Sequence, residues 1–187
     1  DDMAEARGFQ IAYRLIFCEI VIGISIQKIG GHQVIKVFDI YSKLTIKLLY
    51  LLSVIYKEVY IYKPITSRPA NSEKYIIAKY FKGIDTNYLK QLYGIVRLWK
   101  SIEDNNYFIT DLFDDNLPDD FIKSIEEYNV INIDKQTKCI KNTLNLILNK
   151  PTARDYNNII KLQLQHAIEW CNKYNVRINY ESKYFLK

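Results

Sequence analysis

The chain has 187 residues, of which 49% are apolar and 25% are charged, and it carries a net charge of +5 at pH 7. This balance is typical of a globular protein with a sizeable core, and it excludes an intrinsically disordered tail. The modest basic excess would help to attract a polyanion such as nucleic acid, but it equally suits an ordinary soluble protein.

The cysteines and the apolar stretches exclude several classes of protein. Cys18, Cys139 and Cys171 are odd in number and far apart, and only two histidines accompany them, so neither a disulfide framework nor a metal site is predicted. The most apolar stretches, 20–26 and 48–56, are far shorter than the roughly 20 residues that a bilayer requires. No cleavable signal opens the chain. We therefore expect a cytoplasmic protein without a membrane partner.

The first half of the chain alternates between helical and strand patterns. Apolar residues at helical spacing predict a helix over 4–28, which the glycines Gly30 and Gly31 would end from a C′ position. The β-branched and aromatic stretch 32–41 predicts a buried strand.

An amphipathic helix is predicted over 42–57, with Ser42 as its N-cap and with Lys43 and Lys47 as polar positions between apolar pairs. Two further strands are predicted at 58–63 and 73–81, joined by a polar loop that contains two prolines.

This order of elements predicts an α/β fold, the C-terminal half of a doubly wound, Rossmann-like sheet with an antiparallel last strand. The remainder is predicted to be a packed, mainly helical region. One helix would begin with Pro118 at its N1 position, and another at Thr152, which would form a capping box with Asp155. We place the domain boundary between residues 104 and 105.

Two charged residues stand near the ends of predicted strands. Alternation along 32–41 places Lys36 on the same face as Val34 and Phe38. Lys36 either extends its ammonium to solvent or occupies a partly desolvated site where its pKa falls. Glu73 is either a solvated carboxylate or the partner of Lys36. Because neighbouring strand ends of an open α/β sheet converge on one crevice, we expect the two side chains to meet there.

The stretches "GGHQVIKVFD" and "YIYKPITSRPANSEKYIIAKYF" resemble the FtsJ-type, cap-specific RNA 2′-O-ribose methyltransferases. The resemblance covers roughly residues 5–84 and rests on a fixed order of lysine, proline, serine, arginine, glutamate and tyrosine positions. The form "SRPANSE" is more similar to the eukaryotic and viral cap branch than to the bacterial branch. Together with a composition typical of an AT-rich genome, it suggests a large DNA virus.

The resemblance implies roles for named residues. Lys36 corresponds to the catalytic lysine, and Glu73 to the glutamate, of a lysine, aspartate, lysine, glutamate tetrad around the target ribose. A ribose 2′-hydroxyl is a poor nucleophile at neutral pH, so a lysine with a lowered pKa would accept or steer its proton. The loop would bind RNA phosphate and ribose oxygens through Lys63, Ser67, Arg68, Asn71 and Ser72. For Ser67 and Arg68, hydrogen bonds that shape the loop are an equal alternative.

The resemblance also implies S-adenosylmethionine as the cofactor, although the chain contains no G-x-G turn to cradle it. The cofactor motif and the motif aspartate would lie upstream of residue 1, with Asp2 as a poorer alternative for the aspartate. Residues 1–104 are therefore expected to be the C-terminal part of an FtsJ-like domain, with 105–187 as a helical extension. The remainder of the domain, or a partner subunit, would be needed.

The predicted function is methylation of a ribose 2′-hydroxyl in RNA, and the predicted substrate is the cap-proximal nucleotide of mRNA. If the source is viral, the protein is expected in the host cytoplasm or in the virion. The alternative is a catalytically inactive RNA-binding or structural subunit, which would need neither Lys36 nor Glu73. A DNA-directed enzyme is disfavoured because the motif acts on a ribose hydroxyl.

Overall fold

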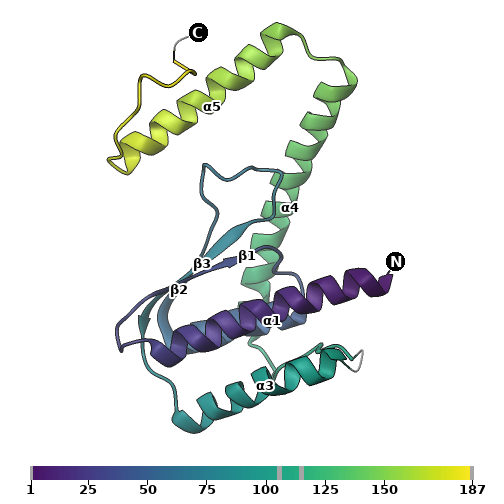
Figure 1. The fold of residues 1–187 in the computed structure, drawn as a ribbon, viewed down its shortest axis with the longest axis vertical. Helices are drawn as coiled ribbons and strands as arrows, with labels where there is room; N and C mark the ends of the chain where they lie inside the picture. The colour runs from purple at the N-terminus through teal and green to yellow at the C-terminus, as the bar shows by residue number, and fades with distance from the viewer. Residues whose placement is uncertain (1, 105–106, 114–115, 186–187) are drawn as a thin grey trace. The chain divides into compact units, whose positions relative to one another are not determined.

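The computed structural model describes residues 2–104, 107–113 and 116–185 (Figure 1). The chain divides into two compact units. The first, here called the sheet unit, comprises residues 1–62 and 73–131. The second, the helical unit, comprises residues 63–72 and 132–187.

The sheet unit contains a three-stranded sheet of β1 (Gln33–Val37), β2 (Tyr56–Tyr62) and β3 (Lys74–Phe81), in the order β1-β3-β2. The central strand β3 is antiparallel to both neighbours, so β1 and β2 run in the same direction. The predicted antiparallel last strand is thereby confirmed, within a mixed α/β fold. Side chains of β1 alternate between exposed and buried from Val34 to Val37, as the sequence predicted. The strand covers Gln33–Val37 and not 32–41, and the prediction that it is buried is wrong for one face, where Val34 and Lys36 are exposed.

Three helices accompany the sheet in this unit: α1 (Asp2–Ile26), α2 (Lys43–Ile55) and α3 (Thr86–Asp104). Helix α1 packs against β1 and α3, and α2 packs against β2 and β3 (Figure 1). The shared core consists of apolar side chains from all these elements, among them Phe17, Ile35, Leu48, Ile76 and Trp99. Burial of such side chains is the main stabilising contribution to the unit.

Helix α2 begins as predicted, because the Ser42 hydroxyl accepts a hydrogen bond from the Thr45 backbone N–H at 3.2 Å. The prediction that Lys47 lies among the polar positions of this helix is wrong. Its side chain is only 3% exposed, and its ammonium pairs with Asp111 at 2.7 Å and donates to the Phe113 carbonyl. These partners come from the segment that follows α3, and they compensate the charge that α2 buries.

The glycines after α1 have a different role from the one predicted. Helix α1 ends at Ile26, so Gly30 does not occupy its C′ position. Gly30 has φ +80° and donates to the Phe81 carbonyl at 2.8 Å, while Phe81 N–H donates to the Gly31 carbonyl at 2.9 Å. The pair thus forms the turn that brings the chain alongside the end of β3, and the positive φ at Gly30 favours glycine there.

Helices α4 (Asp119–Leu148) and α5 (Ala153–Lys173) complete the elements. Residues 119–131 of α4 belong to the sheet unit and the rest to the helical unit. Pro118 precedes α4 and its carbonyl accepts from Ile122 N–H, so the proline stands at the N-cap and not at N1. The acidic residues Asp119 and Asp120 occupy the first turn, where the helix dipole favours them.

In the helical unit, the capping box of Thr152 and Asp155 at the start of α5 is confirmed. The sequence predicted a packed, mainly helical region over 105–187. Ile125, in the part of α4 that belongs to the sheet unit, is buried, but no described side chain of the helical unit is buried. Within the described ranges, no helix is both long enough and apolar enough to cross a membrane.

Candidate active site

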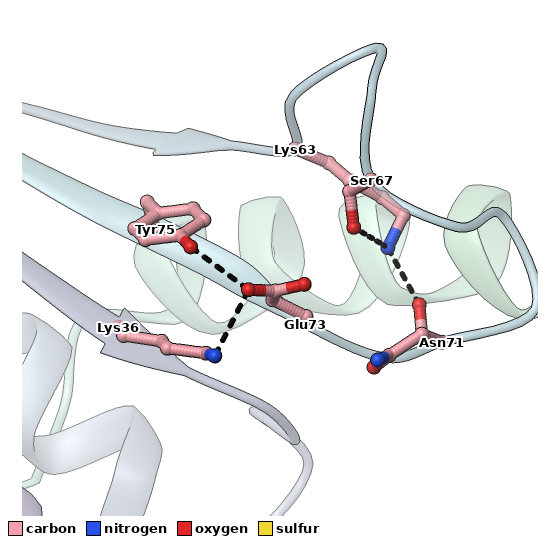
Figure 2. Close-up of polar contacts among 6 residues, drawn as sticks. All are labelled: Lys36, Lys63, Ser67, Asn71, Glu73 and Tyr75. Atoms are coloured by element: carbon pink, nitrogen blue, oxygen red, sulfur yellow. Dashed lines mark hydrogen bonds and ion pairs between the residues drawn. The ribbon is translucent and has the colours of Figure 1, made fainter. Parts of the chain in front are cut away.

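Lys36 and Glu73 meet on neighbouring strands of the sheet unit (Figure 2). Lys36 is the fourth residue of β1, and Glu73 immediately precedes β3. The register pairs Val37 with Lys74 and Lys36 with Tyr75, which places the end of β1 beside the start of β3. Lys36 Nζ lies 3.0 Å from Glu73 Oε1, and the two side chains are 50% and 19% exposed. The structure therefore brings together the two residues for which the sequence predicted catalytic roles.

Tyr75 is a third member of this cluster, which sequence reasoning missed. Its hydroxyl donates to Glu73 Oε1 at 2.8 Å, the same oxygen that pairs with Lys36 (Figure 2). The alternation of side chains along a strand could have identified it, because residues two apart share a face. Glu73 thus holds one ammonium and one phenol on the same side of the sheet.

The electrostatics of Lys36 differ from the prediction. The hydrogen bond from its ammonium to Glu73 raises the pKa of Lys36, outweighing the opposite effect of burial. The hydrogen bond to the same carboxylate also raises the pKa of Tyr75. The expected lowering of the Lys36 pKa is therefore wrong for this arrangement of residues. At neutral pH, Lys36 is a cation and Tyr75 is a neutral donor, so both donate hydrogen bonds.

The backbone that follows Lys36 is held from two directions. The buried ammonium of Lys74 donates to the Phe38 carbonyl at 2.8 Å. The side-chain amide of Asn129, in α4, donates to the Ile40 carbonyl at 3.0 Å. These bonds satisfy carbonyl groups after the end of β1, so the segment next to Lys36 is fixed to β3 and α4. Neither Lys74 nor Asn129 was identified from the sequence.

The polar loop 63–72 belongs to the helical unit and has its own hydrogen bonds. The Lys63 ammonium donates to the Asn71 carbonyl at 2.5 Å and lies 3.5 Å from the Ser67 hydroxyl (Figure 2). Two turns shape the backbone, with Ser67 N–H donating to the Pro64 carbonyl and Asn71 N–H to the Arg68 carbonyl, each at 3.0 Å. Lys63, Ser67 and Asn71 therefore come together within the loop.

The other two loop residues for which the sequence predicted RNA binding are Arg68 and Ser72. Arg68 is exposed, and Ser72 is half-buried at the end of the loop, one residue before Glu73. The Gln136 side-chain amide, in α4, donates to the Ala70 carbonyl at 3.1 Å. These contacts are hydrogen bonds within and around the loop, as in the alternative in which its polar groups shape the loop. The guanidinium of Arg68, in contrast, is accessible to an anionic ligand.

A second cluster on the sheet has the same residue types. Glu58 accepts hydrogen bonds from Lys79 at 3.1 Å and from the Tyr60 hydroxyl at 3.0 Å. These side chains come from β2 and β3, away from the end of β1 that bears Lys36. A lysine, glutamate and tyrosine in contact are thus not specific to a catalytic site, and this second cluster is a matched structural control for the first.

The residues around Lys36 do not fit S-adenosylmethionine. They offer an ammonium, a carboxylate and a phenol, which suit a hydroxyl group, and the sequence has no glycine-rich turn that would accept a nucleotide-like cofactor. Among the residues that the structure describes, no group of three or more histidine, cysteine, aspartate and glutamate side chains is placed to hold a metal ion.

Comparison with known proteins finds related sequences for the first part of the chain. The sequence model of the FtsJ-like methyltransferase family matches residues 3–81. The chain is 42% identical over 76 residues to cap-specific mRNA (nucleoside-2′-O-)-methyltransferase 1 of Mus musculus and of Homo sapiens, which is 40% of this chain and 9% of each relative. It is 38% identical over 86 residues to cap-specific mRNA (nucleoside-2′-O-)-methyltransferase 1A of Caenorhabditis briggsae, covering 44% of this chain and 10% of the relative.

The chain thus spans about a tenth of the length of the curated relatives it matches. The family match includes the strands and helices that position Lys36, Glu73 and Tyr75. Residues 3–81 are therefore similar to the FtsJ-like methyltransferase family, and 76 residues of the chain are similar to cap-specific mRNA (nucleoside-2′-O-)-methyltransferase 1.

Proposed function

We propose that residues 3–81 form the ribose-binding side of the active site of an RNA 2′-O-methyltransferase, and that its substrate is capped mRNA. The observation that carries the proposal is the contact between Lys36 and Glu73, 3.0 Å long, at the junction of β1 and β3. This pair lies within the segment that matches the FtsJ-like family, as do Glu58 and Lys79. What distinguishes Lys36 and Glu73 is their place at the end of β1 and the start of β3.

In this proposal Lys36 orients the target 2′-hydroxyl. Its ammonium would donate a hydrogen bond to the ribose oxygen, which leaves a lone pair of that oxygen directed at the methyl group to be transferred. Glu73 would fix the ammonium in place, and Tyr75 would fix the carboxylate. The reaction must also release the hydroxyl proton, and a lysine whose pKa is raised is a poor acceptor for it.

A second cation near Lys36 would change the pKa of Lys36. Like charges disfavour the protonated form, so an additional ammonium would oppose Glu73 and lower the pKa of Lys36. The tetrad of the family that this chain resembles contains such a second lysine. Lys36 would then accept the proton as well as orient the oxygen.

S-adenosylmethionine would supply the methyl group. The described residues form the ribose side of the site, and the binding of this cofactor is assigned to a further part of the FtsJ-like fold. Arg68, which is exposed, would contact RNA phosphate, and Ser67, Asn71 and Ser72 would donate to ribose or phosphate oxygens. Lys63 would chiefly shape the loop through its bond to the Asn71 carbonyl.

The test compares two capped RNAs that differ only at the cap-proximal sugar, one with a 2′-hydroxyl and one with a 2′-deoxy position. Transfer of a labelled methyl group from S-adenosylmethionine is measured with the longest polypeptide of this reading frame. We expect transfer to the first RNA and a background level for the second. Equal transfer to both RNAs would refute 2′-O-methylation.

A catalytically inactive RNA-binding subunit is the second candidate, and the raised pKa of Lys36 favours it. An ammonium held by a carboxylate suits the recognition of an RNA oxygen without any proton transfer. This candidate predicts that the same polypeptide binds capped RNA and that no methyl transfer occurs with either RNA.

A further inference from the structure

The basic residues of the chain are concentrated in the helical unit. Residues 63–72 and 132–187 contain twelve lysine and arginine residues against four aspartate and glutamate residues, a net charge of +8. The sheet unit contains fourteen against seventeen, a net charge of −3. The overall charge of +5 therefore combines two parts of opposite sign. A basic excess of this size on one part of a chain is typical of a surface that binds a polyanion.

The second half of α4 presents part of this charge on one side. At 100° per residue, six positions between 135 and 149 fall within a sector of about 120° on the helix surface. All six are exposed lysines or asparagines: Lys135, Lys138, Lys141, Asn142, Asn145 and Asn149. The opposite side carries the aliphatic residues Ile140, Leu144 and Ile147. The side with the lysines and asparagines, here called the basic face, extends about 21 Å along the helix.

The lysines of the basic face are available to an external anion. Among the residues that the structure describes, none of the three forms an ion pair. The one acidic residue in this half of α4 is Asp134, which precedes the basic face. From 135 to 154 the sequence has five basic residues and no acidic one. The charge of the basic face is therefore not neutralised by the helix that bears it.

The polar loop 63–72 belongs to the same unit as the basic face. The side-chain amide of Gln136 donates to the Ala70 carbonyl at 3.1 Å, and Gln136 is the residue next to Lys135. Arg68, two residues before Ala70, is exposed. The cations of the loop and of α4 thus come from two segments that are held together by this hydrogen bond.

The residue types of the basic face favour RNA over an anionic lipid surface. Lysine ammonium groups and asparagine amides both donate to phosphate and sugar oxygens, which is how proteins hold the backbone of a nucleic acid. A helix that lies on a bilayer instead inserts its apolar side, commonly with tryptophan or phenylalanine. Residues 132–149 contain no aromatic side chain.

We propose that the basic face of α4 is a binding site for the backbone of single-stranded RNA, in addition to the loop 63–72. The three lysines would pair with phosphates, and the three asparagines would donate to phosphate or sugar oxygens. Because the contacts are to the backbone, the binding would not depend on the RNA sequence. The choice of RNA as the polyanion rests on the proposed function. The site itself lies outside residues 3–81, so the family match assigns it no role.

The test measures the affinity of the full 187-residue chain for a labelled, single-stranded capped RNA. Fluorescence anisotropy is recorded over a series of salt concentrations and without S-adenosylmethionine. The logarithm of the affinity falls with the logarithm of the salt concentration, by a slope of about 0.7 for each phosphate of a single strand that is contacted. Replacing Lys135, Lys138 and Lys141 together by glutamine should weaken binding by about tenfold or more and make the slope shallower by about 2.

The matched control replaces Lys90, Arg97 and Lys100 together by glutamine. These three residues are exposed on one side of α3, in the sheet unit, so the control removes the same net charge. It should leave the slope unchanged. Arginine in place of the three lysines of the basic face retains the cations and should preserve binding. Unchanged helical circular dichroism would establish that each variant still folds.

Three results would overturn the proposal: no binding of the RNA by the unaltered chain, a slope that the glutamine variant of the basic face does not change, or an equal change in the α3 control. Vesicles that contain phosphatidylserine test the lipid alternative. Binding to these vesicles that Leu144→Asp abolishes, together with RNA binding that is independent of the three lysines, would also overturn it and assign α4 to a membrane surface.

This outcome can be separated from catalysis. RNA binding that depends on the three lysines, without methyl transfer by the unaltered polypeptide, would support the site and refute only the enzymatic function. Methyl transfer by the unaltered polypeptide, with an RNA affinity that the glutamine variant of the basic face does not change, would do the reverse.

Discussion

The ammonium of Lys36 and the carboxylate of Glu73 lie 3.0 Å apart, although α2, β2 and a polar loop separate them along the chain. The antiparallel insertion of β3 beside β1 produces this contact. The hydrogen bond to Glu73 raises the pKa of Lys36 and fixes the position of its ammonium.

Replacing Glu73 by glutamine should lower the pKa of Lys36. The neutral amide removes the hydrogen bond to a carboxylate that raises this pKa above the ordinary value of 10.5. The pKa is measured from the Cε chemical shift of Lys36 in a titration by nuclear magnetic resonance. Because the folded pKa is the higher one, the contribution of the pair to stability is complete below the unfolded pKa and is lost as the pH rises through the folded pKa.

Glu58→Gln is the control for this titration, since Glu58 holds Lys79 through the same type of contact. It should lower the pKa of Lys79 and leave that of Lys36 unchanged. If the pKa of Lys36 is the same in the Glu73→Gln variant as in the unaltered protein, the electrostatic account of the site is contradicted.

Replacing Asp111 by asparagine should destabilise the sheet unit. Lys47 is buried, and the change removes the carboxylate that compensates its charge. Loss of one partner from a fully buried pair costs about 3–5 kcal/mol, and we expect about 2 kcal/mol because Asp111 retains solvent contact. The free energy of unfolding is measured with urea by circular dichroism.

The matched variants for this prediction are Lys43→Met and the double change Lys47→Met with Asp111→Asn. Lys43 is largely exposed, so its loss should cost less than about 1 kcal/mol. The double change removes both charges and should recover most of the stability. A double variant as unstable as Asp111→Asn alone would show that the buried charge is not the cause.

The buried phenol of Tyr56 should make the protein sensitive to alkali. Burial raises the pKa of Tyr56 to about 12, and its hydroxyl lies 3.1 and 3.0 Å from the amide oxygens of Gln27 and Gln33. The folded pKa exceeds the unfolded value of 10, so stability is lost as the pH rises from 10 towards 12. Urea unfolding at pH 8 and pH 11 should show a smaller loss for Tyr56→Phe than for the unaltered protein. An equal loss for both would assign the alkaline effect to other groups.

The capping box of α5 predicts a local effect in the helical unit. Thr152→Ala removes the hydroxyl that accepts from Asp155 N–H, and such a change costs about 1 kcal/mol of helix stability. Faster hydrogen exchange is expected at the first turn of α5. Thr152→Ser, which retains the acceptor, should leave the exchange unchanged, and faster exchange there as well would indicate that the hydroxyl is not responsible.

Features that depend on neighbouring residues in the sequence were predictable. The N-cap at Ser42, the capping box at Thr152 and the alternation along β1 each follow from local hydrogen bonding or side-chain direction. The contact between Lys36 and Glu73 was also predicted, because the strand order of an α/β sheet constrains which strand ends meet.

Features that depend on distant segments were not predictable in the same way. Lys47 has the spacing of an exposed lysine, and only the packing of the segment containing Asp111 shows that its charge is buried and paired. The role of Gly30 and Gly31 depends on where β3 ends, and the exposure of α5 depends on what packs against it. The sign of the Lys36 pKa shift required the distance to Glu73, which no sequence pattern contains.

The central claim is tested most directly by measuring methyl transfer to capped RNA with the Lys36→Ala and Lys79→Ala variants side by side. Both lysines pair with a glutamate on the same sheet, but only Lys36 lies at the junction of β1 and β3. The account predicts that Lys36→Ala of the longest polypeptide of this reading frame loses transfer, while Lys79→Ala retains it. Equal activity of the two variants would contradict a role for Lys36 in the reaction.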